Sequence, residues 1–269
     1  MADQEAYLQL LDLTFQVANS LNGKPAPNYR IPDCNKLAQK LYSHAATIYW
    51  LSQGTYAPIP KPEGTHFIDF ASVAVITRAT LETYLTMYEL FFELISEDEQ
   101  EFRHAYWLLS GFIVREKYLS NRPQAKSLFG DSLQEIEGLR LRIQKTSHYA
   151  SLTEKQKNKC LAADLPKLSF EKRLESADLA PKFTRTIHQY LSGYVHSDGL
   201  IAIQISQAKS EAKQDEFIQG FMYIIMIVIS KMILSYRKIF PSAEAYCLAK
   251  PEIFKLAETW SGTTQMLDL

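Results

Sequence analysis

The sequence has few glycines, few cysteines and no excess of charge of either sign. Only ten glycines occur in 269 residues, and no Asn-Gly or Asp-Gly pair stands between alternating segments, which argues against a fold of β-hairpins. Cys34, Cys160 and Cys247 form neither a C-x-x-C pair nor a zinc-ligand spacing, so we expect reduced thiols. The net charge of −1 gives no general attraction to nucleic acid or anionic membrane and leaves only a local basic patch open.

Long apolar runs are also missing. The N-terminal stretch MADQEAYLQLLDL carries acidic residues where a signal peptide carries basic ones, so we expect no export. The most apolar segment is 217–234, but its uninterrupted run, 221–229, is nine residues long and Lys231 follows it closely. A membrane span needs about 20 such residues. We therefore expect 217–234 to be a core helix of a soluble, cytoplasmic protein that has no membrane partner.

The patterns that are present predict an all-α fold, a single-domain helical bundle with two long buried helices at about 67–95 and 213–240. The domain is expected to comprise N-terminal helices in 1–66, a core bundle in 67–240 and short C-terminal helices in 241–269. Segment 200–205, LIAIQI, resembles a strand but has no partner strand. No composition shift marks a second domain.

Local signals predict where helices begin. Asp33, Ser96-x-x-Glu99 and Thr153-x-x-Gln156 are N-capping signals, Asp131 or Ser132 opens a further helix, and Pro181 suits the first turn of another. The expected helices span about 4–21, 33–54, 67–95, 96–120, 132–145, a short helix after 153, and then 181–196, 217–240 and 251–260.

Stop signals separate these helices. Gly23, Gly54 and Gly199 are expected to end helices, because glycine adopts the left-handed conformation that follows a helix C-terminus. The segment 56–65, YAPIPKPEGT, has three prolines and a glycine and is expected to be a loop. The more polar region 149–181 is expected to form short helices and loops.

Two charged side chains interrupt the first long apolar helix. Arg78 and Glu82 lie one helical turn apart among apolar neighbours. Burying a guanidinium and a carboxylate costs several kcal/mol per ion unless both are paired and hydrogen-bonded. Arginine before glutamate is the less favourable order for an i,i+4 pair. We therefore expect further polar partners from other helices, in a buried salt bridge that fixes helix register or in a binding or catalytic site.

A second polar group lies in 185–199, RTIHQYLSGYVHSDG. At about 100° per residue, Arg185, Ser192 and His196 project within about 20° of one line, whereas Tyr190 lies on another face. This stack could hold a phosphate or an oxyanion, or could transfer a proton through His196. The alternative is that His196 is a capping or core residue.

Other chemical signals are absent from the sequence. No phosphate-binding loop, dinucleotide fingerprint, zinc-protease helix or nucleophile elbow occurs, and the six histidines have no ligand spacing. We therefore expect no metal and no cofactor. Arg140, Arg142 and Lys145 could contact phosphates, but a solvated helix face is the preferred interpretation.

The two polar motifs together resemble a bacterial all-helical family that is catalogued as a domain of unknown function. Its pattern is R-x-x-x-E, here Arg78-Ala-Thr-Leu-Glu82, followed by Y-x-S-x-x-x-H-[SG], here from Tyr190 to Ser197. The similarity covers about 67–234. The resemblance supplies no activity. It implies a helical bundle in which five side chains converge: Arg78, Glu82, Tyr190, Ser192 and His196.

A more distant similarity is to the HEPN helical-bundle ribonucleases of toxin and phage-defence systems. Their mark is an arginine and a histidine separated by four to six residues on a late helix, and it implies that the two side chains complete a ribonuclease site across a dimer. This chain departs from that pattern, because Arg185 is too close to His188 and too far from His196.

Three functional hypotheses follow. In the leading one, the polar cluster fixes the fold or binds a small anionic ligand without catalysis. The alternatives are a HEPN-like ribonuclease that uses His196 with Arg78 or Arg185, and an interaction protein that dimerises through an apolar helix face. A nucleic acid partner is expected only under the ribonuclease hypothesis. The sequence does not decide whether the protein is an enzyme.

Overall fold

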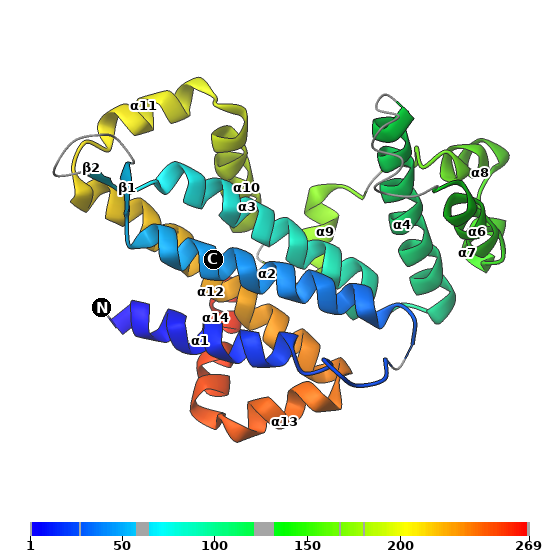
Figure 1. Cartoon of the computed structure of the whole chain (residues 1–269), viewed down its shortest axis with the longest axis horizontal. Coiled ribbons are helices and arrows are strands. Elements are labelled where there is room, and N and C mark those ends of the chain that lie inside the picture. The colour runs from blue at the N-terminus through cyan, green and yellow to red at the C-terminus, as the bar shows by residue number, and fades with distance from the viewer. Residues whose placement is uncertain are drawn as a thin grey trace. The chain divides into compact units, whose positions relative to one another are not determined.

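The computed structural model describes residues 2–26, 28–57, 65–120, 132–166, 168–179 and 181–267. These residues form thirteen α-helices, one π-helical turn and two three-residue strands (Figure 1). The all-α fold class is therefore confirmed. Asp131, one of two candidate caps, lies outside the described residues, and so does most of the expected loop 56–65.

The chain divides into two compact units. Unit 1 comprises Met1–Tyr88 and Phe170–Leu269, and unit 2 comprises Glu89–Ser169. The single-domain organisation stays a prediction, because compactness alone does not test whether the units fold together. Each unit is described by itself below.

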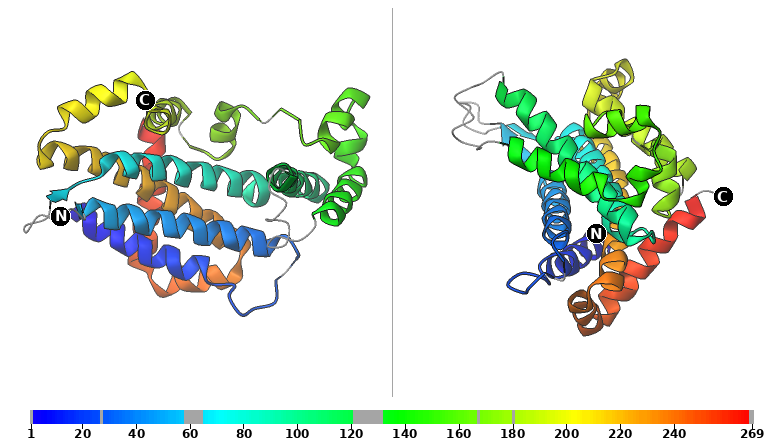
Figure 2. Two further views of the ribbon diagram at one scale, coloured as in Figure 1. Left: turned by 45° about the horizontal axis from the view of Figure 1, so that its top comes forward. Right: turned by 90° about the vertical axis from the view of Figure 1, so that its right-hand side faces the viewer.

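Four helices form the centre of unit 1. α1 (Ala2–Ala18), α2 (Ile31–Ser52) and α3 (Phe70–Met87) run up and down beside one another, and α12 (Glu211–Ile239) packs against all three (Figures 1 and 2). α13 (Pro241–Ala249) and α14 (Pro251–Leu267) lie against α1 and α12. The last helix is thus longer than the expected 251–260.

α12 is the predicted second long helix. Thirteen of its residues are buried, and they include an unbroken run from Ile225 to Ile233. Lys231 lies within this run, and its Nζ donates to Asp178 Oδ2 at 2.7 Å, so a buried lysine stem ends in a paired ammonium group. Among the described helices, α12 alone is long and apolar enough to cross a membrane, and 67% of its most apolar window is buried inside the protein. The cytoplasmic localisation stays a prediction.

α3 is shorter than the predicted 67–95. Asp69 caps its N-terminus by accepting from Ser72 N, and the helix continues after Met87 into a π-helical turn, Tyr88–Phe92. Ten residues of α3 are buried, because helices α2, α10 and α12 pack around it. Its burial confirms the expected core position of this helix.

A small hairpin joins α2 to α3, where the sequence predicted only a loop. β1 (Thr55–Ala57) pairs antiparallel with β2 (Thr65–Phe67), and Thr55 lies opposite Phe67. Gly54, at φ +79°, ends α2 and turns the chain into β1, as expected for a helix-stop glycine. Asp33 lies in the first turn of α2 rather than at its N-cap.

α9 (Phe170–Ser176), α10 (Pro181–His196) and α11 (Gly199–Gln207) complete unit 1. α10 begins at Pro181, as predicted. Gly199 was expected to end it, but Ser197, at φ +55°, makes the turn and Gly199 opens α11. The strand-like segment 200–205 is therefore helical, and its Ile201 is buried against Gly193 of α10.

Unit 2 is built from α4 (Glu97–Ser120), α6 (Leu133–Gln144), α7 (Ser147–Ala150) and α8 (Glu154–Leu161). Its core joins α4, α6 and α8: Phe102, Ala105, Leu109, Ile136, Leu139, Ile143 and Cys160. Both predicted capping signals are present, since Ser96 Oγ accepts from Glu99 N and Thr153 and Gln156 form a full capping box.

The basic stretch of unit 2 is paired with acidic residues. Arg140 contacts Glu137, and Arg142 Nε donates to Glu101 Oε1 at 2.8 Å. These contacts agree with a partly solvated helix face whose charges are compensated by acidic residues of α6 and α4. Cys34, Cys160 and Cys247 are buried free thiols, as expected, and burial raises the pKa of Cys160 to about 11.

Candidate functional site

The predicted polar cluster forms between α3 and α10 in unit 1. Arg78 Nε donates to Glu82 Oε1 at 3.0 Å, and His188 Nε2 lies 3.2 Å from the same oxygen. The expectation that another helix supplies a polar partner to Arg78 and Glu82 is thus confirmed. The partner is His188, which lies in the second polar segment but was not among the residues expected to join the cluster.

The cluster is less buried than predicted. The side chains of Arg78 and His188 are 20% and 19% exposed, whereas that of Glu82 is 43% exposed. The expected salt bridge between Arg78 and Glu82 is therefore formed, but it is partly exposed rather than buried. Water reaches the carboxylate of Glu82 and lowers the cost of its charge.

Glu82 is held in its charged form. The hydrogen bond from His188, and secondarily the charge and hydrogen bond of Arg78, lower the pKa of Glu82 to about 2 against the opposing effect of burial. A carboxylate with this pKa is ionised near neutral pH and can only accept. His188 therefore donates through Nε2, which assigns the tautomer of a neutral imidazole.

α9 covers the other side of His188. The ring of Phe170 stacks on that of His188 with centroids 3.7 Å apart, and Arg173 Nη2 donates to Thr86 Oγ1 at 3.1 Å. These contacts join α9 to α10 and α9 to α3. The cluster therefore fixes three helices to one another.

The remaining predicted residues do not join the cluster. Arg185 forms an ion pair with Glu171 at 3.2 Å, and both side chains are about half exposed. His196 is exposed at the end of α10, and within the described part of the chain it has no hydrogen-bond partner. The convergence of His196 with Glu82 that the family resemblance implies is not seen, because His196 lies about two turns beyond the level at which α10 meets Glu82.

Tyr190 and Ser192 lie elsewhere on α10. Ser192 is half-buried, and no hydrogen bond of its hydroxyl is described. The hydroxyl of Tyr190 lies 3.1 Å from that of Tyr194, which donates to Gln204 Oε1 of α11 at 3.0 Å. The structure thus brings Arg78 and Glu82 together, and it shows no contact that joins them to Tyr190, Ser192 or His196 among the residues it describes.

The charges of the cluster limit its chemistry. Glu82 already accepts from both nitrogen donors, so an incoming anion would meet a carboxylate at the place to which these donors point. A carboxylate–imidazole pair can orient a general base, and here Phe170 also packs on a face of the imidazole ring and joins it to α9. The geometry is better suited to fixing helix positions than to binding an anion.

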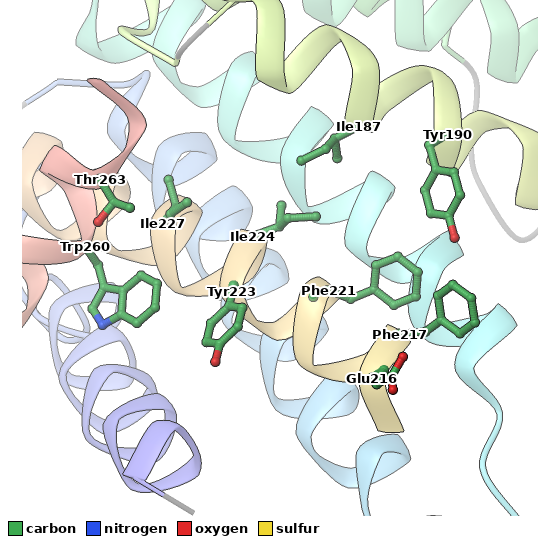
Figure 3. A pocket seen from close by; sticks show the side chains of 11 residues that line it. Ile187, Tyr190, Glu216, Phe217, Phe221, Tyr223, Ile224, Ile227, Trp260 and Thr263 are labelled. Carbon is green, nitrogen blue, oxygen red and sulfur yellow. The ribbon is translucent and has the colours of Figure 1, made fainter. Parts of the chain in front are cut away.

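The sequence missed a second feature, an apolar groove on unit 1. It has a volume of about 530 Å³ and is bounded by α10, α12 and α14 (Figure 3). Pockets that bind small molecules usually measure about 300–1,000 Å³. Its described lining residues are Ile187, Tyr190, Glu216, Phe217, Gly220, Phe221, Tyr223, Ile224, Ile227, Trp260 and Thr263.

Aromatic rings form both ends of this groove. At one end the rings of Tyr223 and Trp260 stack 5.5 Å apart, and at the other the rings of Tyr190 and Phe221 lie 6.3 Å apart (Figure 3). Gly220 contributes no side chain, and a Cβ built on it would meet no atom within 4 Å. The wall of the groove is thus open at this position.

A sequence signal for the groove exists but is not specific. Phe217, Phe221, Ile224 and Ile227 recur at the spacing of one helix face. Such a stripe ordinarily predicts a face buried in the core. Only the positions of α10 and α14 show that this stripe borders a groove.

Comparison of the chain with protein-family models, with curated proteins and with solved structures gives no match. The fold and the site define only a class of protein: an all-helical protein with a charge-compensated polar cluster and an aromatic groove. The resemblance to the family of unknown function and to HEPN proteins stays a prediction, as do the homodimer and the small anionic ligand.

Proposed function

We propose that this protein is a non-catalytic binding protein whose groove between α10, α12 and α14 takes a small, mainly apolar molecule. The observation that carries the proposal is the groove itself, with its volume of about 530 Å³ and its five aromatic side chains. Apolar lining with a few polar groups is the usual composition of a small-molecule site.

The polar cluster supports this function by positioning α10. His188, which Glu82 holds, lies next to Ile187 in the sequence and half a turn before Tyr190, and both of these line the groove. The contact of His188 with Glu82 therefore fixes the rotation of α10 about its axis. This assigns Arg78 and Glu82 a structural role, in keeping with the leading hypothesis from the sequence.

Gly220 offers a test that does not disturb the core. Gly220→Leu places a side chain in open space within the groove, and leucine is favoured over glycine in a helix by about 0.8 kcal/mol. We expect the wild-type protein to bind the uncharged fluorescent probe N-phenylnaphthylamine, with increased emission. Gly220→Leu should abolish this binding without lowering the midpoint of thermal unfolding.

Gly111→Leu is the matched control. Gly111 also lies within a helix and has no atom within 4 Å of a built Cβ, but it belongs to α4 in unit 2. This variant should bind the probe as the wild-type does. Probe binding that survives Gly220→Leu, or its absence in the wild-type protein, would contradict the proposal. Cleavage of RNA that His196→Gln abolishes would favour the ribonuclease alternative instead.

A further inference from the structure

One end of the groove carries a negative charge. Among the described lining residues, Glu216 is the only one with an acidic or basic side chain, and its carboxylate lies beside the ring of Phe217 (Figure 3). Phe217 in turn stacks on the buried ring of Phe70, with centroids 5.2 Å apart, so its position is fixed from behind. A carboxylate next to a fixed aromatic face is the combination that binds organic cations.

An ammonium group of the protein itself already uses this combination. Lys213 Nζ contacts Glu216 Oε2 and lies 5.9 Å from the centroid of the Phe217 ring. Both Lys213 and Glu216 are exposed, with half or more of each side chain accessible, so their contact is easily exchanged. The lysine shows which chemistry this end of the groove accepts.

The surrounding charges favour a cation as well. The first two turns of α12 carry Glu211, Asp215 and Glu216, against Lys213 and the preceding Lys209. The positive end of a helix dipole attracts anions, but its effect falls off within the first turn. Glu216 lies in the second turn, where its own charge determines the local potential.

The rest of the groove is apolar and elongated. From Glu216 to Ile227 the lining residues follow α12 for about 16 Å, at about 1.5 Å per residue. The far end is formed by Ile227, Trp260 and Tyr223 and, among the residues that the structure describes there, has no charged side chain (Figure 3). Its polar atoms are the hydroxyl and indole groups of neutral side chains.

We infer, resting on the proposed function, that the ligand is an elongated organic amine with an apolar body and a cationic end. The apolar body lies along α12 toward Trp260, and the cation contacts Glu216 and the face of Phe217. The cation takes the place that the ammonium of Lys213 occupies in the structure. Lys213 is thus an internal competitor that lowers the affinity for cations and not for neutral molecules.

Three probes with an unbranched ten-carbon chain test the charge preference by calorimetric titration: decyltrimethylammonium and decanoate, each below its micelle concentration, and decanol, below its solubility limit. We expect the cation to bind the wild-type protein about fivefold more tightly than decanol, from one partly exposed charge contact and one cation–π contact. Decanoate should bind more weakly than decanol.

Variants distinguish the contact of the cation with Glu216 from a general attraction by the negative charges around the groove. Glu216→Gln should remove the preference for the cation and keep decanol binding, whereas Asp215→Asn removes the same charge one residue away and should keep the preference. Lys213→Met should tighten cation binding severalfold and leave decanol binding unchanged. Gly220→Leu should prevent binding of all three probes.

The outcomes distinguish this inference from the proposed function. Decanol binding that Gly220→Leu blocks, together with no preference for the cation, overturns the inference and retains the groove as a binding site. A cation preference that persists in Glu216→Gln, or that Asp215→Asn removes equally, also overturns it. Absence of binding for all three probes overturns both.

Discussion

At the residue scale, Glu82 accepts two hydrogen bonds with one oxygen, and it is still reached by water. The contacts from His188 and Arg78 stabilise the carboxylate rather than the carboxylic acid, which is why the pKa of Glu82 falls to about 2. An acidic group whose pKa is lower in the folded state than in the unfolded state stabilises the folded state at pH values above its ordinary pKa. The stabilisation disappears as the pH falls through the folded pKa.

This linkage predicts an acid-sensitive contribution to stability. The contribution of Glu82 should be fully present above pH 4.5 and should be lost between pH 4.5 and about 2. Glu82→Gln should lower the free energy of unfolding at neutral pH by about 1–2 kcal/mol, between the values for exposed ion pairs and for hydrogen bonds to charged groups. Urea unfolding of both proteins at a series of pH values measures the difference.

The difference between the two proteins isolates Glu82, because the other carboxylates titrate in both. We expect the two stability curves to converge as the pH falls from 4.5 to about 2. His188→Leu should narrow the pH range over which the curves converge, since the hydrogen bond from His188 is the largest cause of the lowered pKa of Glu82. Curves that stay parallel over the whole range would show that Glu82 has no linked stabilising contact.

At the scale of elements, two glycines show how much depends on single residues. Gly54 directly follows the end of α2, whereas Gly23, which was expected to end a helix, lies in the turns about five residues beyond the end of α1; their φ values are +79° and +72°. Their surroundings differ, because a Cβ on Gly23 would meet nothing within 4 Å, whereas one on Gly54 would lie 2.1 Å from His66 Nε2. His66 in turn contacts Glu211 at the start of α12, 3.4 Å from its Oε1.

These two glycines predict unequal losses of stability. Gly23→Ala should cost about 1–2 kcal/mol, which is the cost of a left-handed conformation for a residue with a Cβ. Gly54→Ala should cost more, because the new methyl group must also displace the imidazole of His66. Denaturant unfolding of the two variants measures both losses. Equal losses would mean that the hairpin yields freely at His66.

At the scale of the whole molecule, the chain contains two compact units with separate buried clusters. α4, α6 and α8 enclose the core of unit 2, while α12 and its neighbours enclose that of unit 1. Unit 2 interrupts unit 1 in the sequence between Tyr88 and Phe170. A segment that has its own buried cluster can unfold locally while the rest of the protein stays folded.

Leu109 tests whether the units unfold separately. It is fully buried in the core of unit 2, so Leu109→Ala should cost about 2–5 kcal/mol. We expect amide hydrogen exchange to accelerate in 97–119 and 133–161 and to stay unchanged in α2 and α12. Acceleration throughout the chain would instead support the single-domain organisation predicted from the sequence.

The sequence by itself determined the features that depend on neighbours along the chain. The helical fold class, the capping box of Thr153 and Gln156, and the start of α10 at Pro181 follow from residue types within a few positions. Helix periodicity also placed Arg78 and Glu82 on one face and required a partner for them. These predictions succeed because capping and amphipathicity act over one or two helical turns.

Tertiary structure alone decided which residues from distant segments meet. Glu82 contacts His188, 106 positions away in the sequence, and not His196. The packing of α10 on α3 decides which turns of the two helices lie opposite each other. The same packing, with α14, leaves a groove beside a stripe of α12 that a sequence pattern assigns to the core. The spacing of apolar residues in the sequence predicts that one face of a helix is apolar. Whether that face is covered depends on how all the helices pack together.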